Sequence, residues 1–300
     1  MCKEEDRLCN PVAWEAVFLT LNISSLLINT LHHVILSRII ALKGTNYLLI
    51  LRFIAALDIA EALVSCVRVS CTFRPLFLDS RIFSTCFTVL SSVFTIRYYI
   101  MATACVERLT TIMYPMSYST SCFASRIALW MALQIILLVI FNIIIDSVFF
   151  TDICMSTYYG PIDVSGFWPP KFILSLRVVA SCVILIALII MFLELNKMKK
   201  RSLTEQQREL VVATKTVMII SALLVACLIP PFIGLALLGV TKTRHDIFTP
   251  LGLVAFFVYG ILNTIVYGWR NASYRKALID TVKRVYSRQL VNSSGEAQQS

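Results

Sequence analysis

The chain has 300 residues, of which 58% are hydrophobic and 15% charged, and its mean hydropathy is +0.80. A soluble domain of this length is about half apolar and about a quarter charged. The composition therefore argues against an ordinary soluble domain and predicts an integral membrane protein. The formal net charge of +10 is expected to reflect membrane topology and attraction to anionic membrane lipids, and not nucleic-acid binding.

The apolar residues gather in seven blocks, each about 20 residues or longer, which is the length a helix needs to cross a bilayer. Unpaired backbone polar groups are costly in lipid, so each block is predicted to be helical. The blocks are residues 11–36, 47–71, 82–106, 127–150, 172–195, 210–240 and 247–269. The sequence therefore predicts an all-α membrane protein with a seven-transmembrane helix bundle at residues 11–269.

Lysine and arginine are unevenly distributed between the two sides of these blocks. Fifteen lie on the side reached after the first block, and seven lie on the side of the N-terminus. Cytoplasmic loops carry the excess of basic residues. We therefore expect a multi-pass protein of the plasma membrane, with an extracellular N-terminal segment at residues 1–10 and a cytoplasmic C-terminus.

The residues after the last block, WRNASYRKALIDTVKRVYS, mix apolar and basic side chains. Tyr274, Leu278, Val282 and Val285 fall on one helical face. This pattern predicts a short amphipathic eighth helix at residues 270–286 that lies along the inner leaflet. The remaining residues, 287–300, are predicted to be a disordered cytoplasmic tail.

Ten cysteines are present, and most lie inside apolar blocks, where burial as small hydrophobic residues is expected. Extracellular cysteines oxidise, so Cys86 and Cys154 are predicted to join the third helix to the second outer loop. Alternatives are a Cys2–Cys9 loop, or a tie from either of these to Cys71. No Cys/His cluster suggests a metal, and no cofactor is expected.

Ionisable residues within a membrane helix are costly, so each needs a partner or a function. Asp58 lies midway along the second block, and Glu61 follows one turn later on the same face. Arg97 lies at similar depth in the third block and is expected to pair with one of these carboxylates. The pair would either hold two helices in register or form a polar core that rearranges during switching.

The third block ends in CVERLTTIMYPMSY, with adjacent charges at Glu107 and Arg108. One alternative is that both charges merely snorkel to the membrane surface. The other is that Glu107 holds Arg108 until the acid is protonated or a helix moves, after which Arg108 meets a cytoplasmic protein. Two further features lie in the last two blocks. Pro230 and Pro231, near the outer third of the sixth block, are expected to kink its helix and form a hinge. Asn263 and Tyr267 share one face of the seventh block, and either side chain could bridge to the Asp58 region through water.

Together these features resemble a rhodopsin-like (class A) G-protein-coupled receptor over about residues 29–278. Asn29 resembles the asparagine of helix 1, and LRFIAALDIAEAL resembles the helix-2 segment around Asp58. ERLTTIMYPMSY is similar to the Asp/Glu-Arg-Tyr motif, with Pro115 and Tyr118 in register. CLIPPF is similar to the Cys-Trp-x-Pro hinge, and NTIVY to the Asn-Pro-x-x-Tyr motif.

Within this class, TIVYGWRNASYRKAL and MATACVERLTTIMYPMSYST are similar to segments of odorant receptors. The resemblance favours a divergent odorant or chemosensory receptor, and a class A receptor for a lipid, peptide or other ligand is the alternative. Leu109, Leu228 and Thr264 depart from the motif tyrosine, tryptophan and proline of the class. Arg97 stands where the class commonly has a small polar residue beside a sodium ion, so no sodium binding is expected.

The resemblance implies a receptor and not an enzyme. An agonist would favour an outward swing of the sixth helix about Pro230, with rearrangement of Tyr267 and Arg108 and activation of a heterotrimeric G protein. Kinase and arrestin are further expected partners. A membrane transporter or channel is a remote alternative, because no pair of broken helices is visible.

The ligand site is expected between the outer halves of helices 3, 5, 6 and 7. Its predicted lining is mostly apolar and suits a small organic molecule: Leu90, Ser91, Phe94, Thr95, Tyr98, Phe232, Leu235, Leu253, Phe256 and Phe257. The absence of a carboxylate at Leu90 argues against an amine ligand. Arg177 is the cation of this region and would either hold an acid ligand or pair with Asp146.

Overall fold

The computed structural model describes residues 11–43, 46–73, 80–115, 118, 125–149, 153–156, 160–163, 169–198, 204–230, 233, 248–281 and 283. Its long helices are α1 (Pro11–Lys43), α2 (Asn46–Phe73), α3 (Ser80–Met113), α6 (Ile127–Phe149), α7 (Pro169–Met198), α8 (Glu205–Ala226) and α10 (Phe248–Arg270). Each predicted apolar block coincides with one of these helices, so the helical prediction is confirmed within the described residues.

A short antiparallel hairpin lies between α6 and α7. It consists of β1 (Ile153–Ser156) and β2 (Gly160–Asp163). The sequence did not predict these strands, because the turn-forming residues of this segment indicated only a loop. β2 contacts α3, as expected if this segment lies over the end of the helical bundle.

Four helical stretches are long and apolar enough to cross a membrane: Ala16–Ile40, Val89–Met113, Ser175–Met198 and Gln207–Ala226. A shorter apolar stretch occurs in α6, at Ile127–Phe141. Four charged residues interrupt the hydropathy of α2: Arg52, Asp58, Glu61 and Arg68. The described helices therefore indicate a membrane-embedded, predominantly α-helical protein.

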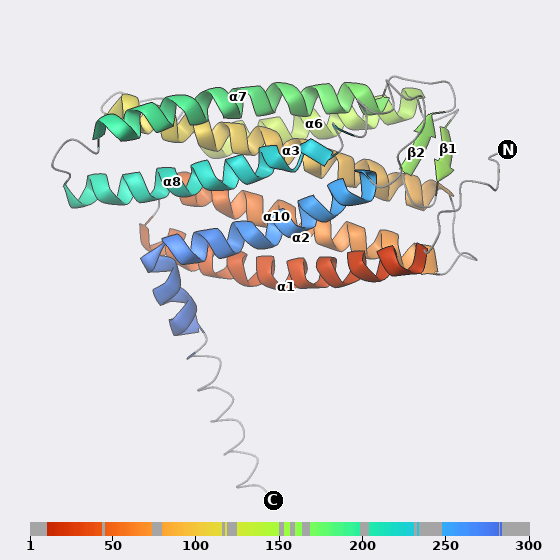
Figure 1. Cartoon of the computed structure of the whole chain (residues 1–300), viewed down its shortest axis with the longest axis horizontal. Coiled ribbons are helices and arrows are strands. Elements are labelled where there is room, and N and C mark those ends of the chain that lie inside the picture. The colour runs from red at the N-terminus through yellow and green to blue at the C-terminus, as the bar shows by residue number, and fades with distance from the viewer. Residues whose placement is uncertain are drawn as a thin grey trace, which may run out of the picture.

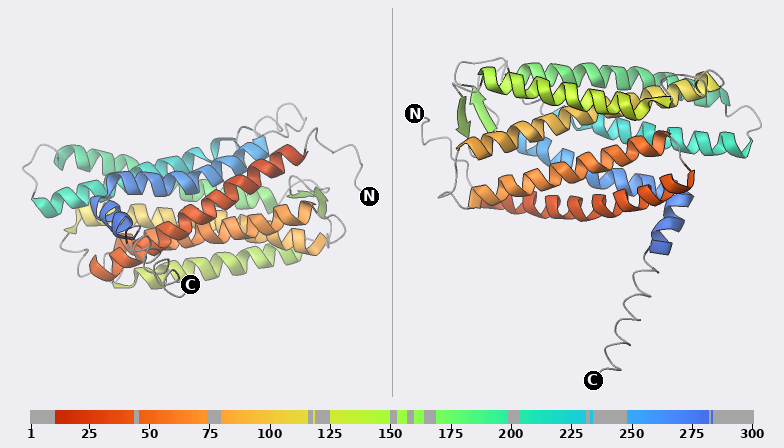
Figure 2. Two further views of the ribbon diagram at one scale, coloured as in Figure 1. Left: turned by 90° about the horizontal axis from the view of Figure 1, so that it is seen from below. Right: turned by 180° about the vertical axis from the view of Figure 1, so that it is seen from behind.

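The helices lie side by side with their long axes roughly aligned (Figure 1, Figure 2). α3 contacts α2, α6, α7 and α8, whereas α1 packs mainly on α2 and α10. In the apolar stretch of α3, 78% of residues are buried, compared with 33–44% in the three other membrane-length stretches. α3 is therefore the central helix, and its polar residues face protein on most sides.

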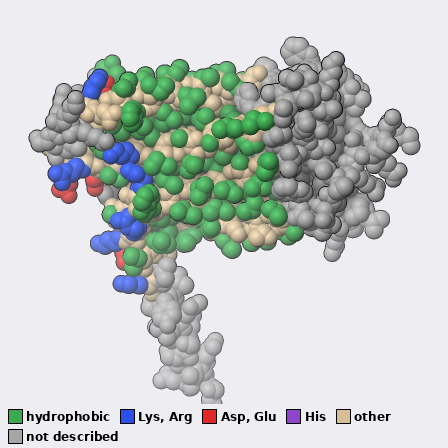
Figure 3. All heavy atoms as spheres, in the orientation of Figure 1, with side chains coloured by type: hydrophobic (Ala, Val, Ile, Leu, Met, Phe, Trp, Pro, Cys, Tyr) green, Lys and Arg blue, Asp and Glu red, His purple; other side chains and the backbone are tan. Residues whose placement is uncertain are grey.

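The flanks of the bundle are apolar. Large exposed hydrophobic side chains cover α1, α6 and α7, among them Leu27, Leu137 and Ile189. Hydrophobic side chains also form a broad belt on the face shown in Figure 3. A continuous apolar surface of this kind is characteristic of contact with a partner or a membrane. On the same face, the lysine and arginine side chains gather at the end from which the C-terminal helical segment leaves (Figure 3).

α8 ends before the prolines of the sixth block. The backbone N–H of Cys227 donates to carbonyls three and four residues earlier, and Leu228 N donates to Val225 O at 3.0 Å. These short-range bonds tighten the helix end, and proline disfavours helical geometry at the residue before it. The expected interruption of the sixth helix near its prolines therefore lies at Cys227–Leu228, one turn before Pro230, and helical geometry resumes at Ile229 and Pro230.

A C-terminal helical segment, residues 272–281, follows α10 and turns away from it (Figure 1). Asn271 is not helical and its side-chain oxygen accepts from Tyr274 N at 3.1 Å, which makes Asn271 the N-cap of the segment. Tyr274 is only 3% exposed, and Leu278 packs against the same core. The prediction that this face lies on lipid is therefore wrong for Tyr274, which packs into the bundle, while Val282 and Val285 lie outside the described side chains.

Candidate functional site

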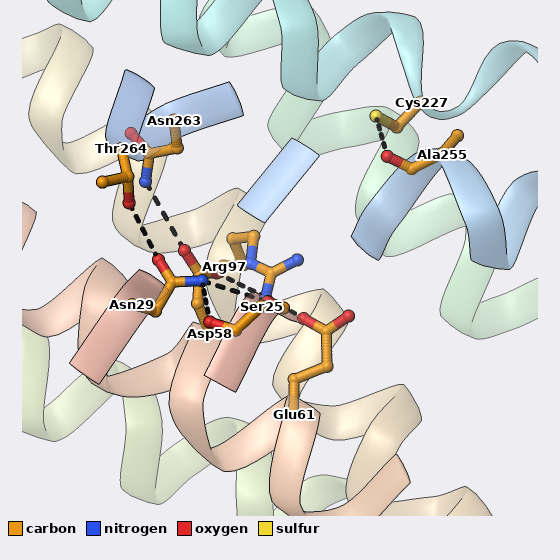
Figure 4. Close-up of polar contacts among 9 residues, drawn as sticks. All are labelled: Ser25, Asn29, Asp58, Glu61, Arg97, Cys227, Ala255, Asn263 and Thr264. Atoms are coloured by element: carbon orange, nitrogen blue, oxygen red, sulfur yellow. Dashed lines mark hydrogen bonds and ion pairs between the residues drawn. The ribbon is translucent and has the colours of Figure 1, made fainter. Parts of the chain in front are cut away.

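A charged cluster lies in the middle of the bundle, between α2 and α3 (Figure 4). Arg97 Nη2 lies 2.6 Å from Asp58 Oδ1 and also pairs with Glu61 Oε2. The three residues are 0–2% exposed. The predicted pairing of Arg97 with a helix-2 carboxylate is confirmed, and both carboxylates take part because they are one helical turn apart.

Hydrogen bonds extend this cluster to α1 and α10 (Figure 4). Asn263 Nδ2 donates to Asp58 Oδ2 at 3.5 Å, so the predicted contact of α10 with the Asp58 region is direct. Thr264 Oγ1 donates to Asn29 Oδ1 at 3.1 Å, and Asn29 Nδ2 donates to Ser25. The predicted residues Asn29, Asp58 and Arg97 are thus brought together, and Thr264 forms a contact that proline in its place would lack.

Gly260 allows α10 to approach α1 at this level. A Cβ atom at position 260 would lie 3.3 Å from Ser25 Oγ and 3.5 Å from Asn29 Nδ2. We expect Gly260→Leu to lower the free energy of unfolding by about 1–3 kcal/mol, because an overpacked core must shift its backbone. Thermal unfolding of the purified full chain in detergent measures this effect. The outward-facing substitution Ile265→Leu is the control, expected within about 0.5 kcal/mol, and an equal effect of both would contradict close packing at Gly260.

Two carboxylates share one guanidinium, and aromatic rings surround its remaining surface. The guanidinium carbon of Arg97 lies 5.5 Å from the ring centre of Tyr259 and 5.9 Å from that of Phe94. Nε and Nη1 of Arg97 have no hydrogen-bond partner in the described part of the chain. Cation–π attraction therefore stabilises the charge where acceptors are lacking, and the guanidinium occupies the space beside Asp58.

A second polar cluster lies at the end of α3. Arg108 donates to both carboxylate oxygens of Glu107, through Nε and Nη2. Tyr118 Oη donates to Glu107 Oε1 at 2.8 Å. Glu107 is fully buried, and Arg108 is 6% exposed. The predicted acid–base contact is confirmed, and the burial contradicts the alternative of two snorkelling charges; Pro115 lies exposed just beyond α3.

Residues that the sequence interpretation missed cover Arg108. Its guanidinium carbon lies 4.8 Å from the ring centre of Tyr47, at the start of α2. The hydroxyls of Tyr47 and Tyr267 are 2.9 Å apart, and Asn271 Nδ2 donates to Tyr267 Oη at 2.7 Å. Tyr267 therefore belongs to this second polar cluster and not to the group around Asp58. The signal for Tyr47 was its position at the first turn of α2, level with Arg108.

The C-terminal helical segment joins the same end of the bundle. Tyr274 Oη lies 2.9 Å from His32 Nδ1 of α1, and the rings of Tyr274 and Tyr267 are 5.1 Å apart in a T-shaped arrangement. Burial raises the pKa of Tyr274, so its hydroxyl stays protonated. Arg38 Nη1 also donates to Thr281 Oγ1 at 2.6 Å. These contacts fix the segment to α1 and α10.

A third polar group surrounds Arg177 of α7, which contacts α3 on both sides of Phe94 in the sequence. Arg177 Nε donates to Thr95 Oγ1 at 3.2 Å, and Nη2 donates to Ser91 O and Oγ at 3.1 and 3.0 Å. Phe94 stacks on Phe256 of α10 with ring centres 4.6 Å apart. Five predicted ligand-site residues are therefore neighbours.

The other predicted ligand-site residues have different surroundings. Tyr98 Oη donates to Leu224 O at 2.9 Å, its ring touches Phe256, and Leu90 is buried in the same core cluster. Phe257 packs on Phe18 of α1, so it is not part of the Arg177 group. The remaining predictions lie outside the described side chains: Phe232, Leu235, Leu253, Asp146, Cys86 and Cys154. The predicted Cys86–Cys154 disulfide therefore stays a prediction.

No protein-family model matches the chain, and no curated protein shows significant similarity to it. Among the described residues, no group of three or more His, Cys, Asp or Glu side chains is placed to hold a metal ion. The three polar groups around Arg97, Arg108 and Arg177 are therefore the features from which a function is inferred.

Proposed function

We propose that the chain is a rhodopsin-like G-protein-coupled receptor with seven transmembrane helices, an extracellular N-terminus and a cytoplasmic C-terminus in the plasma membrane. The observation that supports this most is Arg108, at the end of the central helix α3. It is held by Glu107, which Tyr118 also contacts, and is covered by Tyr47. An arginine that is paired and covered in this way can contact another protein only after the neighbouring helices move.

The arrangement of the helices supports seven spans. α2 and α10 lie alongside the four membrane-length stretches (Figure 2), and the charges Asp58 and Glu61 of α2 face Arg97 instead of the apolar surface. Such internal pairing lowers the cost of charges at membrane depth. The basic end in Figure 3 suits the cytoplasmic side, because basic loops stay inside.

The proposed mechanism is a shift between two conformations. A ligand among the outer halves of α3, α7 and α10 would contact Phe94 and Phe256, and Phe94 in turn contacts Arg97. Movement of α8 at its interruption before Pro230 would separate α8 from α3 at the inner end. Tyr267 and Arg108 would then rearrange and admit a heterotrimeric G protein. A ligand shifts this equilibrium only as far as its affinities for the two states differ.

The chemosensory subtype is proposed on the sequence resemblance, and a class A receptor for another small ligand, a lipid or a peptide is the alternative. A transporter is less well supported because the two carboxylates of α2 at membrane depth are paired inside the bundle. Asp58 and Glu61 both pair with Arg97, whereas a transport path needs polar groups that face a water-filled cavity.

The experiment that tests the proposal is a ligand screen of the full chain in cultured cells, read by cyclic AMP and calcium. We expect some small organic molecules to give a concentration-dependent signal that Arg108→Ala reduces by at least about tenfold, since about 1.4 kcal/mol of coupling corresponds to a factor of ten. Surface labelling controls for expression. A ligand signal that is unchanged in Arg108→Ala would contradict the proposed switch.

A further inference from the structure

Arg177 differs from the other two inward-facing arginines in its partners. Arg97 pairs with two carboxylates and Arg108 with one. Arg177 donates only to neutral oxygens, those of Ser91 and Thr95, and no carboxylate of the described side chains lies within ion-pair distance. Among the described side chains, two of these arginines therefore have a carboxylate partner, and Arg177 has only neutral acceptors.

The Arg177 guanidinium is oriented by its contacts but not saturated by them. Nε and Nη2 make the three hydrogen bonds to α3, whereas Nη1 donates to no atom of the described residues. Thr95 Oγ1 donates to Ser91 O at 2.9 Å, so its proton is already used. The Ser91 hydroxyl accepts from Arg177 and keeps its own proton for a ligand.

Two buried aromatic rings lie beside these donors. The guanidinium carbon of Arg177 lies 5.7 Å from the ring centre of Phe94, which in turn stacks on Phe256. A fixed cation beside two stacked rings suits a molecule with one anionic group and an apolar body. Carboxylate is the anion that fits best, because its oxygens match guanidinium donors in a planar arrangement.

We propose that Arg177 binds the carboxylate of a small organic acid. Nη1 and the Ser91 hydroxyl donate to the carboxylate oxygens, and the apolar part of the acid packs on Phe94 and Phe256. This inference rests on the proposed receptor function and names the ligand class of its binding site. The carboxylate of the ligand supplies the counter-charge that Arg177 lacks among the described residues.

The test compares ligands on the unmodified full chain in lipid nanodiscs without G protein. The probes are aliphatic and aromatic monocarboxylic acids, their methyl esters and the alcohols of the same carbon skeletons, and binding is read as a rise in thermal unfolding temperature. We expect at least one acid to bind about tenfold or more tightly than its ester, because only the acid carries a charge to the guanidinium. Equal binding of acid and ester, or no binding by any acid, would overturn the proposal.

Variants locate the site. Arg177→Gln is expected to abolish the preference for acid over ester, and Ser91→Ala to weaken acid binding severalfold. Arg126→Gln, at an exposed arginine just before α6, is the control. An unchanged acid preference in Arg177→Gln overturns the site, and the acid–ester comparison decides the ligand class even if that variant does not fold. Because binding is measured without G protein, its failure is distinct from a failure of the proposed signalling function.

Discussion

Replacing Arg97 with leucine is expected to lower the free energy of unfolding by about 3–5 kcal/mol, the usual cost of removing one partner from a buried ion pair. Asp58 and Glu61 are almost fully buried and both pair with Arg97. Without the guanidinium, two carboxylates would face each other in a low-dielectric interior. The thermal midpoint of the purified full chain in detergent should fall by about 6 °C or more.

The matched control removes every charge of the cluster at once. The triple variant Arg97→Leu, Asp58→Asn and Glu61→Gln is expected to recover most of the lost stability, because no uncompensated charge is left in the core. Recovery would show that the cost arises from charge and not from lost packing. If Arg97→Leu is as stable as the unmodified chain, the cluster does not hold α2 and α3 together.

Glu107→Gln is expected to raise ligand-independent G-protein signalling about tenfold or more. The substitution keeps the size of the side chain but removes the charge that holds Arg108, and hydrogen bonds to charged groups contribute about 1.5–3 kcal/mol each. In the proposed receptor mechanism, this buried Glu107–Arg108 pair stabilises the closed state. Basal cyclic AMP or calcium, normalised to the amount of the chain at the cell surface, measures the change.

Tyr118→Phe is the graded companion of this substitution. Burial raises the pKa of Tyr118 to about 12, so its hydroxyl is protonated and donates to Glu107 throughout the physiological pH range. Its removal should raise basal signalling less than Glu107→Gln, because the Arg108 contacts remain. Thr111→Val is the control. Thr111 Oγ1 donates to the backbone oxygen of Glu107, so its loss leaves the contacts of the Glu107 carboxylate unchanged. Equal basal signalling in all three variants and the unmodified chain would show that Glu107 does not restrain Arg108.

The apolar blocks were sufficient to place the helices, because backbone groups in a hydrophobic segment must pair internally. The cost of isolated charges likewise predicted that Arg97 pairs with a carboxylate of α2, and adjacency predicted the contact between Glu107 and Arg108. These inferences need only the order of the residues along each helix and their expected depth in the membrane.

The sequence could not predict contacts that depend on helix rotation and on the path of the chain between helices. Phe256 and Phe257 look equivalent in sequence, yet successive helical residues point about 100° apart, and only Phe256 meets Phe94. Tyr274 fits an amphipathic pattern, but the turn after Asn271 directs it to His32. The role of Tyr47 depends on how the first turn of α2 packs beside α3.

Guanine-nucleotide exchange on purified heterotrimeric G proteins, driven by the full chain in nanodiscs, tests the central claim most directly because it needs no ligand. The Glu107→Gln variant is expected to accelerate exchange on at least one G-protein class about tenfold over the unmodified chain, and adding Arg108→Ala should return the rate to that of empty nanodiscs. If Glu107→Gln gives the rate of empty nanodiscs with every class, or if exchange persists after Arg108→Ala, the proposed receptor switch is contradicted.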